Sequence, residues 1–174
     1  MKEKTNVQHV KKIVLIALFA AITCVFTMIH IFPSPNGYVH IGDCFVLLSG
    51  FLLGPIAGGV AGGVGSALAD LIGGYPIYII PTLIIKFFMA FLAAYIVKCF
   101  SKMNLTFIGK LLGGIVAEVV MVLGYYIFDA LIYSGFIGAF ATVPGNLSQG
   151  GIGIVFAIII SELLRTSKMD KKLF

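Results

Sequence analysis

Apolar residues follow one another in six runs along the chain, separated by short stretches rich in polar and turn-forming residues. The runs are Ile13–Ile31, Asp43–Leu53, Ile56–Gly73, Pro81–Phe100, Phe107–Tyr133 and Gly145–Leu164. All but the second approach or exceed the ~20 residues that an α-helix needs to cross a 30 Å hydrocarbon core. The pattern therefore predicts an all-α integral membrane protein, in which residues 1–174 form one domain of six transmembrane helices.

The second run is too short for an ordinary membrane-spanning helix. Only Asp43–Leu53 precedes Gly54 and Pro55, and proline marks a break or a tight turn at this point. The sequence leaves two interpretations open: a short tilted helix, or one half of a re-entrant hairpin with the third run.

Composition agrees with a membrane protein, since 60% of the residues are hydrophobic and only 11% are charged. A water-soluble domain of this length could not bury so much apolar surface. The N-terminus resembles a secretory signal, but no polar mature domain follows, so we interpret it as an uncleaved first helix. Cys24, Cys44 and Cys99 are far apart in apolar stretches, which predicts reduced thiols packed in the core rather than a metal or cofactor site.

Basic residues lie in three groups at the edges of apolar runs. The groups are Lys2, Lys4, Lys11 and Lys12; Lys98, Lys102 and Lys110; and Arg165, Lys168, Lys171 and Lys172. The connections 32–42, 74–80 and 134–144 contain no lysine or arginine. By the positive-inside rule both termini are cytoplasmic, which requires an even number of spans. The grouping gives no support to nucleic-acid binding, despite a net charge of +5.

The remaining cation, Lys86, lies inside the fourth run. A charge at such a position costs ~2.5–3.5 kcal/mol on insertion scales, so it normally has a partner or a function. Lys86 lies roughly 8 Å from the outer end of its helix, level with three aspartates at outer helix ends, while Glu118 lies deeper. The sequence leaves open whether Lys86 pairs with Glu118, Asp70 or Asp129.

Two helices carry acids on faces that should point into the bundle. Glu118, Tyr125 and Asp129 share one face of the fifth helix to within about 40°. Asp70 continues a stripe of small residues on the third helix, which is typical of tight helix packing, and an acid is not needed for packing alone. No Gly-Lys-Ser/Thr follows the glycines, so we predict no ATP site in this chain.

The outer connections supply further groups that can bind a polar ligand. The first, FPSPNGYVHIGD, carries Tyr38, His40 and Asp43, although Asp43 could instead cap the second helix.

The sixth helix begins with VPGNLSQGG, in which Asn146 and Gln149 face the same way. Their amides could recognise a neutral solute through hydrogen bonds, or they could join helices to one another. Tyr75 and Tyr78 are secondary candidates, because both could belong to an interfacial aromatic belt.

A pocket that combines a lysine, carboxylates, tyrosines, amides and many phenylalanines suits a small heteroaromatic solute with hydroxyl or amino groups. An alternative is an intramembrane aspartyl protease that uses two of Asp43, Asp70 and Asp129. Such enzymes have a GxGD-type motif, whereas this chain has HIGD. A third interpretation is a purely structural subunit, in which Lys86→Ala and Glu118→Gln would have no phenotype.

Ala17 and Ala21 form an AxxxA pair in the first helix, with Ala20 and Cys24 extending the small surface. This stripe could pack within the bundle or against a helix of another protein.

In combination, these motifs resemble the substrate-binding S components of energy-coupling factor (ECF) vitamin transporters of prokaryotes, over nearly the whole chain. The resemblance rests on AxxxA, on GYVHIGD followed by LLSGFLLGPIAGGVAGGVGSALADLIGGY, on PTLIIK, and on PGNLSQ. It implies a multi-pass, six-helix protein of the plasma membrane that binds a vitamin or precursor in an outer pocket and has no catalytic role.

The resemblance also implies partners and a substrate. The S component would dock on a transmembrane coupling protein that carries two cytoplasmic ATPases, with Ala17 and Ala21 at the contact. The chain is most similar to members assigned to the hydroxymethylpyrimidine moiety of thiamin or to pyridoxine, with riboflavin-type members next.

Overall fold

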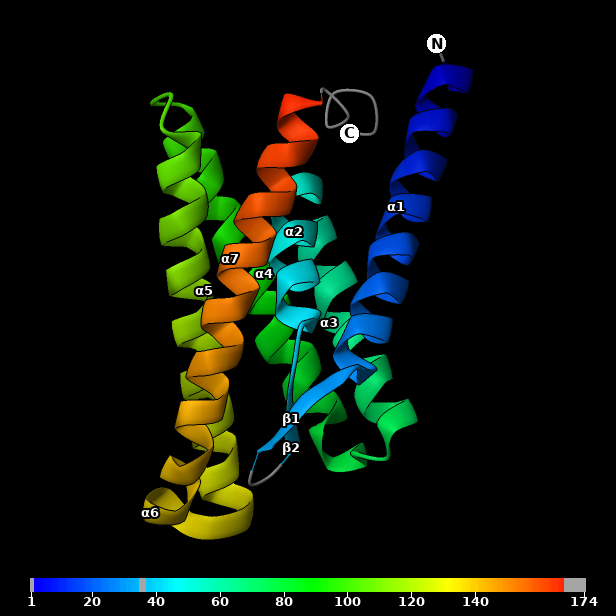
Figure 1. Ribbon diagram of the computed structural model, residues 1–174. Helices are drawn as coiled ribbons and strands as arrows, with labels where there is room; N and C mark the ends of the chain where they lie inside the picture. Colours follow the sequence, from blue (N-terminus) through cyan, green and yellow to red (C-terminus); the bar gives the residue numbers. More distant parts are fainter. Residues whose placement is uncertain (1, 35–36, 168–174) are drawn as a thin grey trace.

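The computed structural model describes residues 2–34 and 37–167, which form an elongated bundle of helices with one β-hairpin (Figure 1). The helices are α1 (Lys2–Met28), α2 (Gly42–Leu53), α3 (Pro55–Gly73), α4 (Ile79–Ser101), α5 (Thr106–Asp129), α6 (Gly135–Ala139) and α7 (Val143–Thr166). Short helical turns are η1 (Pro76–Tyr78), η2 (Ala130–Ser134) and η3 (Phe140–Thr142), and the strands are β1 (His30–Ser34) and β2 (Gly37–His40). α1 begins and α7 ends at one end of the bundle, and the hairpin and α6 lie at the other (Figure 1).

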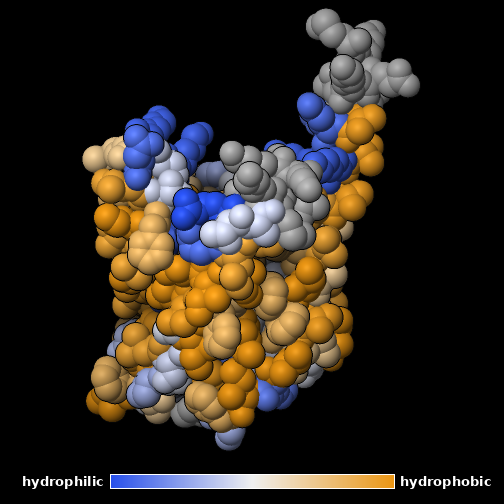
Figure 2. Space-filling model, turned by 45° about the horizontal axis from the view of Figure 1, so that its top comes forward, coloured by the Kyte–Doolittle hydropathy of each residue, from blue (hydrophilic) through white to orange (hydrophobic). Residues whose placement is uncertain are grey.

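Among the described residues, four helical stretches are long and apolar enough to cross a membrane. They are Val7–Met28, Pro55–Gly73, Pro76–Ser101 and Thr106–Thr166, the last of which contains both α5 and α7. Hydrophobic residues cover most of the visible face, and hydrophilic residues gather at the end where α1 begins (Figure 2). The prediction of an all-α membrane protein is confirmed, whereas the number of membrane crossings stays a prediction.

The 12-residue helix α2 is the centre of the core although it is only about 18 Å long. Its side chains Val46, Leu47 and Leu48 are buried together with Met89 of α4 and Met121 of α5. α2 ends at Gly54, whose φ of +83° is strained for any residue with a Cβ, and Pro55 then begins α3. α2 and α3 therefore form a tight helical hairpin.

Small residues bring the backbones of neighbouring helices into contact. A Cβ added to Gly50 would lie 2.5 Å from the carbonyl oxygen of Ala90, and one added to Gly63 would lie 2.8 Å from that of Leu83. Each of these positions therefore has no room for a larger side chain unless α4 shifts. The predicted role of the α3 glycines in close helix packing is confirmed.

The two faces of the α1 small-residue stripe have different surroundings. Ala20 and Cys24 are each only 8% exposed, whereas Ala17 and Ala21 lie on the exposed side of the helix. Packing within the bundle therefore accounts for Ala20 but not for the AxxxA pair.

Cys99 of α4 is exposed, whereas Cys24 and Cys44 are buried. The prediction that all three cysteines pack in the core is therefore wrong for Cys99.

The first outer connection contains a β-hairpin that the sequence analysis did not predict. β1 and β2 are antiparallel, with His30 paired to His40 and Phe32 to Val39. The first helix accordingly ends at Met28 rather than at Ile31. Aromatic and β-branched residues on both sides of the sequence Ser-Pro-Asn-Gly favour this conformation, and Val39 is 1% exposed against the helices.

Candidate functional site

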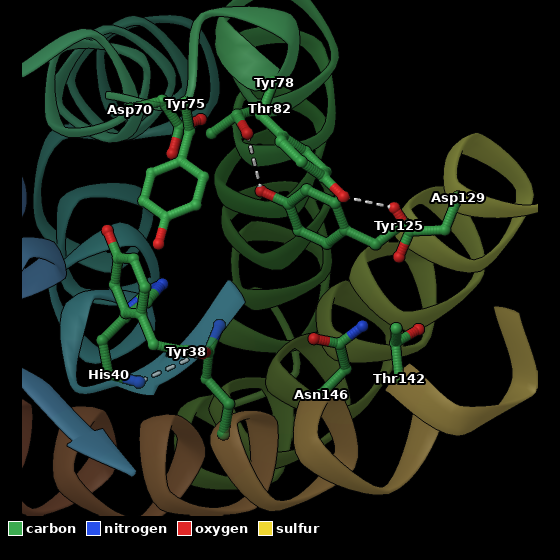
Figure 3. A pocket seen from close by; sticks show the side chains of 11 residues that line it. Tyr38, His40, Asp70, Tyr75, Tyr78, Thr82, Tyr125, Asp129, Thr142 and Asn146 are labelled. Carbon is green, nitrogen blue, oxygen red and sulfur yellow. Dashed lines mark hydrogen bonds between the residues drawn. The ribbon is translucent and has the colours of Figure 1, made fainter. Parts of the chain in front are cut away.

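A cavity of about 80 Å³ opens near the end of the bundle that carries the hairpin (Figure 3). Its lining comes from β2, the end of α3, η1, the start of α4, the end of α5, η3 and the start of α7. The residues are Tyr38, His40, Asp70, Tyr75, Tyr78, Thr82, Tyr125, Asp129, Thr142, Asn146 and Gln149. The structure thus brings together eight residues predicted from sequence: Tyr38, His40, Asp70, Tyr75, Tyr125, Asp129, Asn146 and Gln149.

Four tyrosines provide aromatic walls around the cavity. The ring centroids of Tyr38 and Tyr75 lie 5.6 Å apart, and those of Tyr78 and Tyr125 lie 6.3 Å apart. Tyr78 also stacks on Tyr133, with ring centroids 5.9 Å apart. Such faces can hold a flat ring by stacking and by burial of apolar area.

Hydrogen bonds fix several of these side chains (Figure 3). The Tyr78 hydroxyl donates to Oδ1 of Asp129 at 2.6 Å, and the hydroxyls of Thr82 and Tyr125 lie 3.0 Å apart. Oδ2 of Asp70, by contrast, is buried and has no hydrogen-bond partner among the described residues. Among the buried side-chain atoms of the described lining residues, Oδ2 of Asp70 is therefore the one acceptor left unsatisfied.

Gln149 connects the cavity wall to the interior of the bundle. Its Oε1 accepts a hydrogen bond from the backbone N–H of His40 at 3.2 Å, and its Nε2 donates to Oδ2 of Asp43 at 2.8 Å. His40 in turn accepts a hydrogen bond at Nδ1 from the Gly42 N–H, at 3.0 Å. Gln149 therefore both lines the cavity and joins α7 to the hairpin and to α2.

Lys86 forms an ion pair with Asp43, which was not among the three partners considered from sequence. Lys86 is 1% exposed and Asp43 is fully buried, because Asp43 lies in the first turn of the central helix α2 and faces α4. The capping interpretation of Asp43 is wrong, since the N-cap residue is Ile41 and no side-chain cap bond forms. The Lys86 ammonium lies 5.4 Å from the centroid of the ring of Tyr125, a lining residue, and Lys86 itself does not line the cavity.

Glu118 points into the bundle, as predicted, but it does not line the cavity with Tyr125 and Asp129. It lies about 10 Å from Tyr125 along α5, toward the start of the helix. Both its carboxyl oxygens are buried without a hydrogen-bond partner in the described part of the chain. They face α7 at Gly150 and Gly153, where a Cβ would lie 2.9 Å and 3.3 Å from them.

Two lining residues, Thr82 and Thr142, were missed, and Tyr78 was only a secondary candidate. Thr82 lies one turn before Lys86 on the same face of α4, so the helical period could have identified it. No comparable signal marks Thr142, which sits in a short 3₁₀ turn that hydropathy does not predict.

The hairpin places two titratable groups in unusual surroundings. Burial lowers the pKa of His40 from 6.5 to about 4, so the imidazole is neutral at physiological pH. Burial, together with the nearby carboxylate of Asp70, raises the pKa of Tyr38 to about 12. Both side chains therefore present uncharged polar groups to the cavity.

We expect the stability of the protein to fall as the pH drops below the usual pKa of His40. Unfolding restores the ordinary proton affinity of the imidazole, so protons favour the unfolded chain from about pH 6.5 down to about pH 4. Between pH 7 and pH 5 the loss should be on the order of 2 kcal/mol. Thermal unfolding in detergent at a series of pH values measures it.

The control is His40→Asn, which retains an acceptor for the Gly42 N–H and removes the titrating group. Asp43, Lys86 and His30 also act on His40, so the informative quantity is the difference between the two pH profiles. Identical profiles for the wild type and the variant would contradict the assignment to His40.

A helical membrane protein with a polar, tyrosine-lined cavity near one end has the architecture of a solute-binding transport subunit. The sequence profile of the family described as "ECF-type riboflavin transporter, S component" matches residues 7–166, so the chain belongs to this family. It is a multi-pass protein of the cell membrane and a transporter S component, not an enzyme. The protease alternative is therefore not retained.

Two curated relatives extend the comparison. The chain is 37% identical over 152 residues to an uncharacterized protein of Pyrococcus woesei, covering 83% of this chain and 99% of the relative. It is 31% identical over 160 residues to the thiamine precursor transporter HmpT of Lactococcus lactis subsp. cremoris (strain MG1363), covering 90% of this chain and 89% of the relative.

Proposed function

We propose that this chain is the substrate-binding subunit of an ECF transporter for a water-soluble vitamin or precursor, and that the cavity is its binding site. The observation that carries the proposal is the convergence of four tyrosines, two carboxylates and two amides on one small hollow. Aromatic faces would supply affinity, and the polar groups would orient the solute. Of the eleven residues predicted to bind substrate, we assign direct contact to the eight that line the cavity.

Asp43, Lys86 and Glu118 are proposed to act indirectly. The buried pair of Lys86 and Asp43 lies behind Tyr125 and is tied to Gln149, so it would hold two cavity residues in place. Glu118 lies deeper and would affect the site only through this cluster.

Hydroxymethylpyrimidine is the favoured substrate, pyridoxine comes second, and riboflavin or another B vitamin follows. At ~10–15 Å³ per water, a cavity of about 80 Å³ holds several water molecules, which suits one substituted ring better than three fused rings. The similarity to a relative named as a thiamine precursor transporter favours the same choice.

The proposed topology has six transmembrane helices, α1–α5 and α7, in a single domain with both termini in the cytoplasm. It is supported by the grouping of basic residues near the start of α1 and the end of α7, which lie at the same end of the bundle (Figure 1). The cavity lies toward the opposite end and would open to the outside. ATP-driven uptake would depend on a transmembrane coupling protein and two cytoplasmic ATPases, with Ala17 and Ala21 at the contact.

The test is ligand binding to the purified protein, with mass spectrometry of co-purified small molecules as an independent measurement. We expect hydroxymethylpyrimidine or pyridoxine to raise the unfolding temperature, and the increase should continue with the logarithm of ligand concentration above Kd. Asn146→Phe should fill the cavity and weaken binding at least about 100-fold, an effect of roughly 3 kcal/mol.

The matched control is Ser148→Phe, which adds the same side chain to an exposed position on the same helix and should bind normally. The proposed function would lose its support if no pyrimidine, pyridine or flavin vitamin bound to the wild-type protein. Equal binding by the two phenylalanine variants would argue against this cavity as the site.

A further inference from the structure

The side chains around the cavity carry negative but no positive charge. Its two carboxylates are Asp70 and Asp129, and neither lysine nor arginine occurs among the described lining residues. His40 stays uncharged, because burial lowers its pKa to about 4. The field at the site therefore favours cations and hydrogen-bond donors over anions.

Lys86 lies close enough for its charge to act on Asp70 and His40, but it is already paired with an acid. Its ammonium is paired with Asp43, and Asp43 also accepts a hydrogen bond from Gln149. Both members of the pair are buried and neither is among the described lining residues, although the ammonium lies 5.4 Å from the centroid of the Tyr125 ring. A negatively charged ligand in the cavity would therefore find no free cation to bind.

The two carboxylates that line the cavity differ in the hydrogen bonds that they already accept. Asp129 already accepts a hydrogen bond from Tyr78, whereas Oδ2 of Asp70 is buried and accepts no hydrogen bond in the described structure, although the Thr82 hydroxyl also acts on this carboxylate. Buried acceptors in native proteins are nearly always satisfied by protein, water or ligand. Asp70 lies beside Tyr75 and Thr82 at the cavity wall, where a donor on a ring held between the tyrosines would satisfy it (Figure 3).

We propose that the cavity selects rings that present an amino group to Asp70 and rejects solutes that carry a phosphate or carboxylate. This inference rests on the proposed function and narrows it. It favours an aminopyrimidine over pyridoxine, whose ring substituents include hydroxyl groups but no amino group. It also implies that the transporter takes up the nutrient without its phosphate. A step that adds phosphate would then follow uptake.

The test compares two matched pairs of probes by isothermal titration calorimetry on the purified, full-length protein. One pair is hydroxymethylpyrimidine and its monophosphate; the other is pyridoxamine and pyridoxine, which differ in one amino group. The wild-type protein should bind the first member of each pair at least about tenfold more tightly. A phosphate would meet two carboxylates and no lysine or arginine in the described lining, and an ammonium binds a carboxylate more strongly than a hydroxyl does.

Asp70→Asn should weaken binding of pyridoxamine about 10- to 100-fold and change that of pyridoxine less than about threefold. Glu162→Gln is the control, because it makes the same carboxylate-to-amide change at a residue paired with Lys110 and Arg165 outside the cavity. It should leave all four affinities unchanged. The comparison of phosphate and alcohol in the wild type needs no variant, so it remains decisive if Asp70→Asn fails to fold.

Equal affinity of the wild-type protein for hydroxymethylpyrimidine and its monophosphate would overturn the inference. So would an equal loss of affinity for pyridoxine and pyridoxamine in Asp70→Asn. Binding of some other vitamin without any of these four would also overturn it while leaving the proposed function intact. Failure of every vitamin to bind would remove both.

Discussion

Replacing Lys86 with methionine is expected to destabilise the protein by about 3–5 kcal/mol, the usual cost of removing one member of a buried ion pair. Lys86 and Asp43 are both almost fully buried, so the variant would leave a carboxylate in the core with Gln149 as its one side-chain donor among the described residues. Methionine matches the length of the lysine stem, so a packing defect contributes little. Unfolding by denaturant or heat in detergent micelles measures the change.

A double-mutant cycle identifies the pair as the cause. Lys86→Met combined with Asp43→Asn should recover a large part of the stability lost in the single variant, because no unpaired charge remains. Lys98→Met, at an exposed lysine on the same helix, should change stability by less than about 0.5 kcal/mol. Additive effects of the two core substitutions would contradict a direct interaction between these residues.

The pair also distinguishes a binding subunit from a purely structural one. Because Asp43 holds Gln149 and Lys86 lies under Tyr125, loss of the pair should loosen two cavity residues and weaken binding as well as stability. A structural subunit would lose stability alone. This difference can be measured on the same purified variants, at temperatures where they remain folded.

The helices and their inward faces were predictable because a membrane imposes strong and simple constraints. Hydropathy located all of the long helices, and the helical period placed Glu118 and Asp129 on the buried face of α5. Most of the other predicted cavity residues were identified instead as polar groups in the connections and at the start of the last helix, since such groups have few other places to lie beside an apolar bundle.

The partner of Lys86 was not predictable in the same way. Asp43 lies 43 residues away, and the sequence placed it at the same level along the membrane normal as Asp70 and Asp129. Its contact with Lys86 depends on how α2 packs between α1, α3, α4 and α7, which no local pattern encodes. The level along the membrane normal therefore could not identify the partner, and packing selected an acid outside the three candidates.

The hairpin and the short turns before α7 were missed for another reason. Hydropathy separates helices from connections, and it says little about the structure within a connection. β1 and β2 place Tyr38 and His40 against the cavity, and η3 places Thr142 there. These segments are short, so their conformations depend on the helices against which they pack.

Bulky substitutions at Ala17 and Ala21 are expected to abolish vitamin uptake while leaving vitamin binding intact. Both alanines are exposed on α1, although small residues at this spacing normally allow another helix to approach closely. Leucine at both positions would hold a partner helix away without touching the cavity or the core. Uptake by cells that carry the complete transporter should fall at least about tenfold, which corresponds to roughly 1.4 kcal/mol or more of lost coupling.

Gly151→Leu is the matched control, because Gly151 is exposed on α7 and an added Cβ meets no atom within 4 Å. It adds a leucine to the outer surface of the bundle and should preserve both uptake and binding. Co-purification of the coupling protein with each variant reports directly on the contact, and we expect only the α1 variant to lose it. Normal uptake by the Ala17→Leu/Ala21→Leu protein would show that the coupling protein docks elsewhere, and weakened vitamin binding would show that the substitutions disturb the fold. Only the combination of intact binding, lost coupling and lost uptake separates a docking surface on α1 from the proposed binding site.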